Sequence, residues 1–171
     1  MEPPTKRTYQ DLAGKELCAL LAQTEFSNRY YAMCKLHPLR IHKKFSFSKN
    51  EVFQILAEIG QTPVWDSRDR SYSFNLTLNG WSIHRGFVLQ HQAVEFGFSA
   101  HREQGRAGTN YTGIARATIE LIDPAKIPNP PFPRPNCYSH DELLEVLREC
   151  FQLSDLLCSA LDKIPTQNCS V

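Results

Sequence analysis

The segment Ser71–Ala100, SYSFNLTLNGWSIHRGFVLQHQAVEFGFSA, decides the fold class of this chain. Apolar and polar residues alternate through most of it, which is the period of half-buried β-strands. Asn79-Gly80 separates the first two alternating runs, and this dipeptide favours a two-residue hairpin turn because both residues tolerate positive φ. A second turn is expected near Gln90-His91. The segment therefore predicts an antiparallel meander.

The short loop also sets the register of the hairpin, because a one-residue slip would exchange its two faces. The expected apolar pairs are Leu78 with Trp81, Leu76 with Ile83, Phe74 with Arg85 and Tyr72 with Phe87, and the polar pairs are Thr77 with Ser82 and Asn75 with His84. Arg85 is the charged residue on the apolar face. The next residue, Gly86, predicts a β-bulge that turns the Arg85 side chain away. The third strand is expected to add Val94, Phe96, Phe98 and Ala100 to the apolar face.

Helices are expected before and after this meander in the sequence. Apolar spacing predicts amphipathic helices over 11–23 and 25–36. Two capping boxes mark the starts of later helices, because a serine and a glutamate three residues on can satisfy each other's backbone amides. These pairs are Ser48 with Glu51 and Ser139 with Glu142. The second pair opens a long helix with a continuous apolar stripe that ends at Pro165.

The remaining segments have weaker signals. Residues 39–47 and 111–122 alternate in polarity and predict two further strands. Residues 65–70 predict a charged turn, and the polar, glycine-containing residues 102–110 predict a mobile loop. Six prolines in 123–135 exclude a helix or a central strand and predict an extended crossing that wraps the core.

Together these elements predict an α+β fold. An antiparallel meander of about four to five strands is expected to pack against a long C-terminal helix and one or two N-terminal helices. The chain has 171 residues, of which 42% are hydrophobic and 22% charged, and this fits one globular domain over 10–165. Residues 1–9 are expected to be a disordered lead and residues 166–171 a flexible tail.

Cysteine spacing and the absence of an apolar leader bear on the compartment. The six cysteines include no C-x-x-C pair, and the N-terminus has no hydrophobic signal segment. We therefore expect free thiols and a cytoplasmic protein. The sequence has no run of 18 apolar residues, which argues against a membrane partner.

No motif for a cofactor is present. The sequence lacks a P-loop, a dinucleotide-binding glycine pattern, a nucleophile-turn motif and closely spaced zinc ligands. We therefore expect neither a cofactor nor a metal ion.

One enzymatic alternative comes from the polar face of the meander. A small metal-independent nuclease needs a base, an acid and a cation around the scissile phosphate. The residues that could supply them, if they converge, are His84, His101, Glu95 and Arg116.

The lack of a catalytic motif favours a different function, a non-enzymatic protein that binds a macromolecular partner. In outline the chain resembles small inhibitors of the immunity or anti-defence type, which block their target. The expected contact residues lie on the polar sheet face, the 102–110 loop and the acidic side of the last helix: Asn75, Thr77, His84, Glu95, Arg102, Arg106, Arg116, Glu142, Glu145 and Glu149. The acidic helix favours a basic protein as partner. The net charge of +1 argues against nucleic acid.

A third hypothesis is a small-molecule cup between the sheet and the C-terminal helix. Such a cup would be lined by aromatic residues near Trp81, Phe87 and Phe96. The sequence leaves the oligomeric state and the identity of any partner open.

Overall fold

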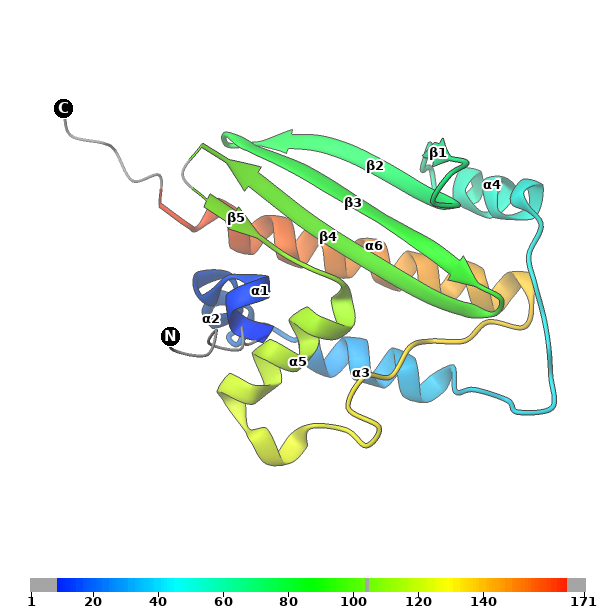
Figure 1. Ribbon diagram of the computed structural model, residues 1–171, viewed down its shortest axis with the longest axis horizontal. Coiled ribbons are helices and arrows are strands. Elements are labelled where there is room, and N and C mark those ends of the chain that lie inside the picture. Colours follow the sequence, from blue (N-terminus) through cyan, green and yellow to red (C-terminus); the bar gives the residue numbers. More distant parts are fainter. Residues whose placement is uncertain (1–8, 104, 166–171) are drawn as a thin grey trace, which may run out of the picture.

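The α+β fold is confirmed by the computed structural model, which describes residues 9–103 and 105–165 (Figure 1). The helices are α1 (Tyr9–Ala13), α2 (Lys15–Leu21), α3 (Phe26–Leu36), α4 (Lys49–Glu58), α5 (Tyr111–Ile122), the 3-10 turn η1 (Pro124–Lys126) and α6 (His140–Asp162). The strands are β1 (Val64–Asp66), β2 (Ser71–Leu78), β3 (Trp81–Gln90), β4 (Ala93–Arg102) and β5 (Gly105–Ala107). The expected disordered lead and flexible tail lie outside the described residues, except that α1 already begins at Tyr9.

The strands form one antiparallel sheet in the order β1-β2-β3-β4-β5. Every pair expected for the β2–β3 hairpin is present, including Leu78 with Trp81 and Asn75 with His84. Asn79 and Gly80 both have positive φ, 45° and 79°, as this turn requires. The Asn-Gly signal therefore set both the turn and the register correctly.

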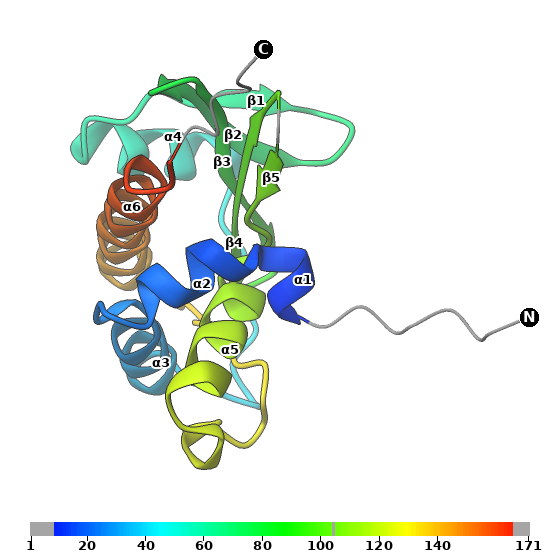
Figure 2. The same cartoon turned by 90° about the vertical axis from the view of Figure 1, so that its left-hand side faces the viewer.

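One face of the sheet is covered by α6, which lies behind the strands in Figure 1 and beside them in Figure 2. The core between these layers is aromatic. Phe87 stacks between Tyr72 and Phe96, with ring centres 4.9 and 5.7 Å away, and the Phe151 ring of α6 meets Phe74 edge-on at 5.0 Å. The helices α2, α3 and α5 extend the core beside the sheet (Figure 2).

The bulge expected at Gly86 is absent, and that prediction was wrong. The register of β2 with β3 runs without interruption through Arg85 and Gly86. Arg85 stays on the covered face, where its guanidinium lies 5.1 Å from the centre of the Phe151 ring and donates to Ser154 Oγ at 3.3 Å. Gly86 serves close packing instead, because a Cβ atom there would lie 2.5 Å from the carbonyl oxygen of Tyr72.

Residues 111–122 form helix α5 and not the expected strand. The side chain of Asn110 accepts a hydrogen bond from the backbone amide of Gly113 at 2.8 Å and caps the helix. Residues 111–115 and 117–119 are all buried, so this helix is apolar on nearly all sides. Small and apolar residues that fill such a helix also satisfy a two-residue alternation, which is why the periodicity misled.

Residues 39–47 form an extended loop and not a strand. A strand needs a neighbour for its backbone groups, and residues 39–47 pair with none of the five strands of the sheet. The alternating aromatics Phe45 and Phe47 instead contact each other edge-on, with ring centres 4.9 Å apart. In Figure 1 the loop runs along the right-hand edge of the molecule between α3 and α4.

Two short strands were not expected. Residues 65–70 do make a turn, but it follows β1, whose Trp65 packs 4.7 Å from the Tyr72 ring. Residues 102–110 contain β5, which pairs with the end of β4. The proline-rich residues 123–135 contain η1 and then contact the core through the carbonyl oxygen of Pro133, which accepts a hydrogen bond from Tyr30 at 3.0 Å.

Candidate functional site

The face of the sheet opposite α6 is open: within the described residues no helix lies across it, and α1 only borders its end near β5 (Figure 2). We call it the open sheet face. Its outward positions follow from the register and are Val64 and Asp66 on β1, Ser71, Ser73, Asn75 and Thr77 on β2, Ser82, His84, Gly86, Val88 and Gln90 on β3, Ala93, Glu95, Gly97, Ser99 and His101 on β4, and Arg106 on β5. Most of these side chains are short and neutral.

Among the outward residues of β2, β3 and β4, only Glu95 carries a formal charge. This carboxylate is already engaged, because it lies 3.1 Å from Arg134 Nη1 and accepts a hydrogen bond from Asn110 Nδ2 at 3.1 Å. Arg106 is exposed on the marginal strand β5 and makes no ion pair among the described residues. The middle of the open sheet face is therefore polar but free of unpaired formal charge.

The two histidines of this face are diagonal neighbours. His101 lies opposite Ser82, two residues before His84, so their Cβ atoms are about 7 to 8 Å apart. His84 Nδ1 is 2.8 Å from Asn75 Oδ1. This contact holds the imidazole in one orientation on the open sheet face.

A shallow hollow of about 400 Å³ lies next to His84, where the facing glycines Gly86 and Gly97 leave the sheet without side chains. Ser99, Thr109 and Arg106 line it, together with Asp11 of α1. The hollow offers hydroxyl, imidazole and guanidinium groups that can hydrogen-bond to a docked polar surface.

The structure does not assemble the expected nuclease cluster. Arg116 lies on α5, since its segment is helical, and pairs there with Glu120 at 2.6 Å. Glu95 is six residues from His101 along β4, a separation of about 20 Å. A base, an acid and a cation are therefore not brought around one point by these four residues, and the expectation that Arg116 shares the polar sheet face was wrong.

Arg102 and Arg106, expected as contact residues of one loop, lie in different environments. Arg102 is on the covered face, where its guanidinium donates to the carbonyl oxygens of Ile164 at 3.3 Å and Pro165 at 3.0 Å. Arg106 borders the hollow on the open side. Only Arg106 is available to a partner at the open sheet face.

Two of the three carboxylates expected as contact residues on α6 are paired with arginines of the chain, and the third, Glu145, is 68% exposed. Glu149 accepts two hydrogen bonds from Arg29, both at 2.8 Å, and Glu145 lies 3.7 Å from His37. Glu142 contacts Arg40 at 2.7 Å. Burial acts to raise the pKa of Glu142, but hydrogen bonds from the Tyr138 amide and the Arg40 guanidinium outweigh it, so its pKa is lowered. These carboxylates stabilise the contact of α6 with neighbouring segments.

The aromatic residues expected to line a ligand cup are packed against one another. Trp81, Phe87 and Phe96 are at most 3% exposed, and the Phe96 ring also meets Phe151 edge-on at 5.4 Å. This packing fills the space between sheet and α6 at these residues. A larger apolar space lies elsewhere, in a groove of about 800 Å³ between α3 and the proline-rich segment.

Sequence reasoning missed this groove. Leu39, Pro130 and Phe132 line it together with Tyr31 of α3. No signal in the sequence indicated it, because the groove joins α3 to a segment about one hundred residues away in the chain.

The described residues show no group of three or more His, Cys, Asp or Glu side chains that could hold a metal ion. In the same residues no helix is both long and apolar enough to cross a membrane. The described cysteines are free thiols: Cys18, Cys34, Cys137, Cys150 and Cys158. Burial raises the pKa of Cys18 to about 11 and that of Cys34 and Cys137 to about 12, so these thiols are poor nucleophiles.

Comparisons with protein-family models, curated proteins and solved structures returned no match to this chain.

Proposed function

We propose that the protein is a non-enzymatic binding protein that docks its open sheet face on one protein partner and so blocks that partner. The observation that carries this proposal is the composition of the face. Charged residues are depleted at the cores of protein interfaces, and β2, β3 and β4 present only Glu95, already paired, among their outward residues.

A sheet face that meets only water is the competing explanation, since antiparallel sheets often have one solvated side. Such a face is expected to bear long charged side chains, which favour solubility. This one bears serines, glycines, Asn75 and Thr77 instead. Short side chains lose little rotational entropy when a partner covers them, so docking here costs less than docking on lysines and glutamates.

The size of the face is adequate for a specific interface. Strands β3 and β4 have ten residues each, a length of about 34 Å. Five strands about 4.8 Å apart give a width of about 19 Å. Because β1 and β5 have only three residues each, the strands together cover about 550 Å², which approaches the roughly 800 Å² per partner of a standard complex before the adjoining turns are added.

The partner chemistry that fits is a polar protein surface with hydrogen-bonding groups. The hydroxyls of Ser99 and Thr109, the imidazole of His84 and the guanidinium of Arg106 are the donors and acceptors offered at the hollow. Because Glu142 and Glu149 of α6 are paired with Arg40 and Arg29, the proposal rests on the sheet face alone.

The test places one long charged side chain in the middle of the face. Ser99→Arg and the control Gln54→Arg, on the exposed side of α4, make the same charge change. Partners captured by the unaltered protein from its native host are purified and titrated calorimetrically with each variant. We expect Ser99→Arg to weaken binding at least tenfold and Gln54→Arg to leave it unchanged. The partner's own activity is then measured with and without the protein, and inhibition is expected.

Equal binding by Ser99→Arg, with folding verified by circular dichroism, would overturn the proposal. A second measurement addresses the nuclease alternative, since His84→Ala and His101→Ala can be assayed for RNA cleavage. Cleavage by the unaltered protein that disappears in either variant, while partner binding persists, would show an enzyme instead.

A further inference from the structure

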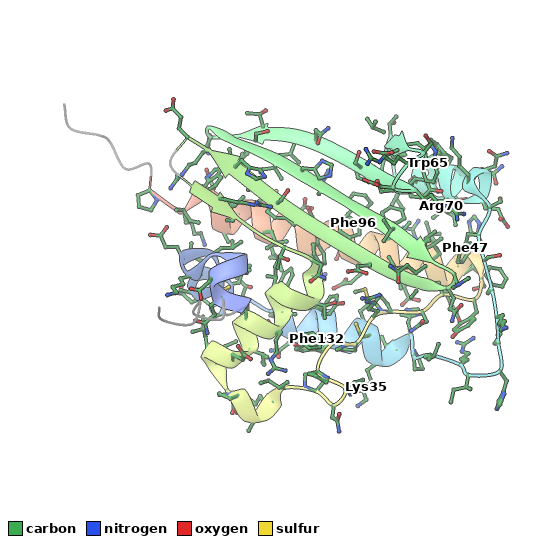
Figure 3. All side chains as sticks on the ribbon, viewed as in Figure 1. Lys35, Phe47, Trp65, Arg70, Phe96 and Phe132 are labelled. Atoms are coloured by element: carbon green, nitrogen blue, oxygen red, sulfur yellow. The ribbon has the colours of Figure 1, made fainter. Side chains whose placement is uncertain are left out.

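The groove between α3 and the proline-rich segment has the features of a second contact surface, independent of the open sheet face. It has a volume of about 800 Å³, within the range of binding pockets. In Figure 3 the labelled residues Lys35 and Phe132 lie below the sheet, on α3 and on the proline-rich segment respectively. Both line the groove.

Large apolar side chains at and beside this groove are exposed. Leu36 is 70% exposed, Leu39 59%, Ile41 82% and Phe132 42%. Leu39 and Phe132 line the groove itself, and Leu36 and Ile41 lie within three residues of Leu39 in the chain. Exposed apolar side chains gathered at a groove are typical of an interaction site.

The charges around the patch are positive. Lys35 and Lys44 are exposed and make no ion pair among the described residues. No acidic residue is among those that line the groove, whereas Asp141 and Glu145 line a separate hollow beside Leu36. The patch therefore combines apolar side chains with uncompensated positive charge at neutral pH. We call residues 35–44 together with the groove the basic groove surface.

We infer that the basic groove surface binds an acidic polypeptide segment with an apolar face. Apolar side chains of that segment enter the groove against Leu39 and Phe132, and its carboxylates pair with Lys35 and Lys44. The argument is charge complementarity together with the amount of apolar surface to be covered.

Other occupants fit less well. A second copy of this chain would bring like charges together, since its patch has the same lysines. A small molecule inside the groove would leave Leu36 and Ile41 in water, because neither lines the groove. A membrane surface cannot fill a concave site of this volume.

The experiment uses two synthetic peptides as probes. They share leucines at helical spacing i, i+3, i+4 and i+7 and differ in their polar positions, which are glutamate in one and lysine in the other. Each is titrated into the ¹⁵N-labelled full chain and followed by amide chemical shifts. We expect the glutamate peptide to shift the amides of Leu36, Leu39 and Ile41, and to bind at least tenfold more tightly than the lysine peptide.

Matched variants test the charges. The double variant Lys35→Glu and Lys44→Glu should weaken binding of the glutamate peptide at least tenfold. The control double variant Arg68→Glu and Lys163→Glu makes the same change in net charge at exposed positions on other elements and should bind normally. Amide spectra of each variant establish that it is folded.

Four results would overturn the inference. These are equal binding of both peptides, binding of neither, shifts confined to other parts of the chain, or equal loss in the control variant. A concentration-dependent dimer in sedimentation that Ile41→Ser disrupts would assign the surface to a second copy. Sedimentation of the protein with phosphatidylserine vesicles, lost in the same variant, would assign it to a membrane. None of these results bears on the open sheet face.

Discussion

The guanidinium of Arg102 lies 4.3 Å from the centre of the Trp81 ring, on the covered face of the sheet. The same group donates to the carbonyl oxygens of Ile164 and Pro165, just beyond the end of α6. Arg102 therefore joins three parts of the molecule: the start of β3, the end of β4 and the C-terminal end of the long helix. Cations are favoured at this end of a helix, where carbonyl oxygens lack partners.

We predict that Arg102→Ala lowers the free energy of unfolding by about 2 kcal/mol, because it removes a cation–π contact and two charge-assisted hydrogen bonds. Arg106→Ala is the matched control, since Arg106 is exposed and unpaired among the described residues, and it should change stability by less than about 0.5 kcal/mol. Urea unfolding followed by tryptophan fluorescence measures both. Equal stability of the two variants would contradict the role given to Arg102.

Gly86 and Gly97 face each other across β3 and β4 but differ in the space above them. A Cβ atom at Gly86 would lie 2.5 Å from the Tyr72 carbonyl oxygen, whereas one at Gly97 would have its nearest neighbour at 3.9 Å. We predict that Gly86→Ala destabilises the protein by about 2 kcal/mol, because the strands must move apart. Gly97→Ala should stay within about 0.5 kcal/mol of the unaltered protein. Thermal unfolding of the two variants measures this difference in stability. A similar loss of stability in both would mean that β2 and β3 can move apart at little cost.

The buried thiols make stability depend on alkaline pH. In the folded state burial raises the pKa of Cys34 and Cys137 to about 12, while an unfolded cysteine ionises near its ordinary value of about 8.5. Above that value the unfolded state binds fewer protons than the folded state. The stabilisation is therefore complete below about pH 8.5 and is lost as the pH rises towards 12, at about 1.4 kcal/mol per pH unit for each thiol.

Urea unfolding at pH 7.5, 9.5 and 10.5 measures this slope. Replacing one thiol, in Cys34→Ala, should reduce the slope by one thiol's share, whatever its effect on stability at pH 7.5. A slope that does not change in this variant would mean that Cys34 ionises as readily in the folded protein as in the unfolded one.

The sequence allowed the hairpin to be placed residue by residue, because Asn79-Gly80 admits a single turn geometry and the apolar residues of β2 and β3 can share a face in only one register. Capping signals at Ser48 and Ser139 were equally local and placed α4 and α6 correctly. Signals of this kind need no knowledge of the rest of the chain.

Features that depend on residues far apart in the sequence could not be predicted from such local signals. The open sheet face followed from alternation, so Asn75, His84 and Glu95 were placed on it correctly, but Arg116 was not, because its segment folds as a helix buried by the N-terminal helices. The groove is formed by α3 and a proline-rich segment about one hundred residues away, and pairing of that kind leaves no periodic trace.

Helix α5 is the element that polarity alternation wrongly predicted to be a strand. A mutation at its N-cap, Asn110, tests what holds the start of this helix in place. Asn110 Oδ1 accepts from the Gly113 amide at 2.8 Å, and Asn110 Nδ2 donates to Glu95 on β4 at 3.1 Å. We predict that Asn110→Ala lowers the free energy of unfolding by about 1 to 2 kcal/mol, since it leaves an orphan helix amide and removes the link to the sheet.

Asn110→Ser separates these two effects. A serine can cap the helix, but its side chain is too short to replace the amide that reaches Glu95, so most of the stability should return while the link stays broken. Chemical denaturation gives the stabilities, and hydrogen exchange of the Gly113 amide reports the cap directly: exchange should be fast in Asn110→Ala and slow in Asn110→Ser. If Asn110→Ser is as unstable as Asn110→Ala, the contact with Glu95 and not the cap holds the start of α5 in place.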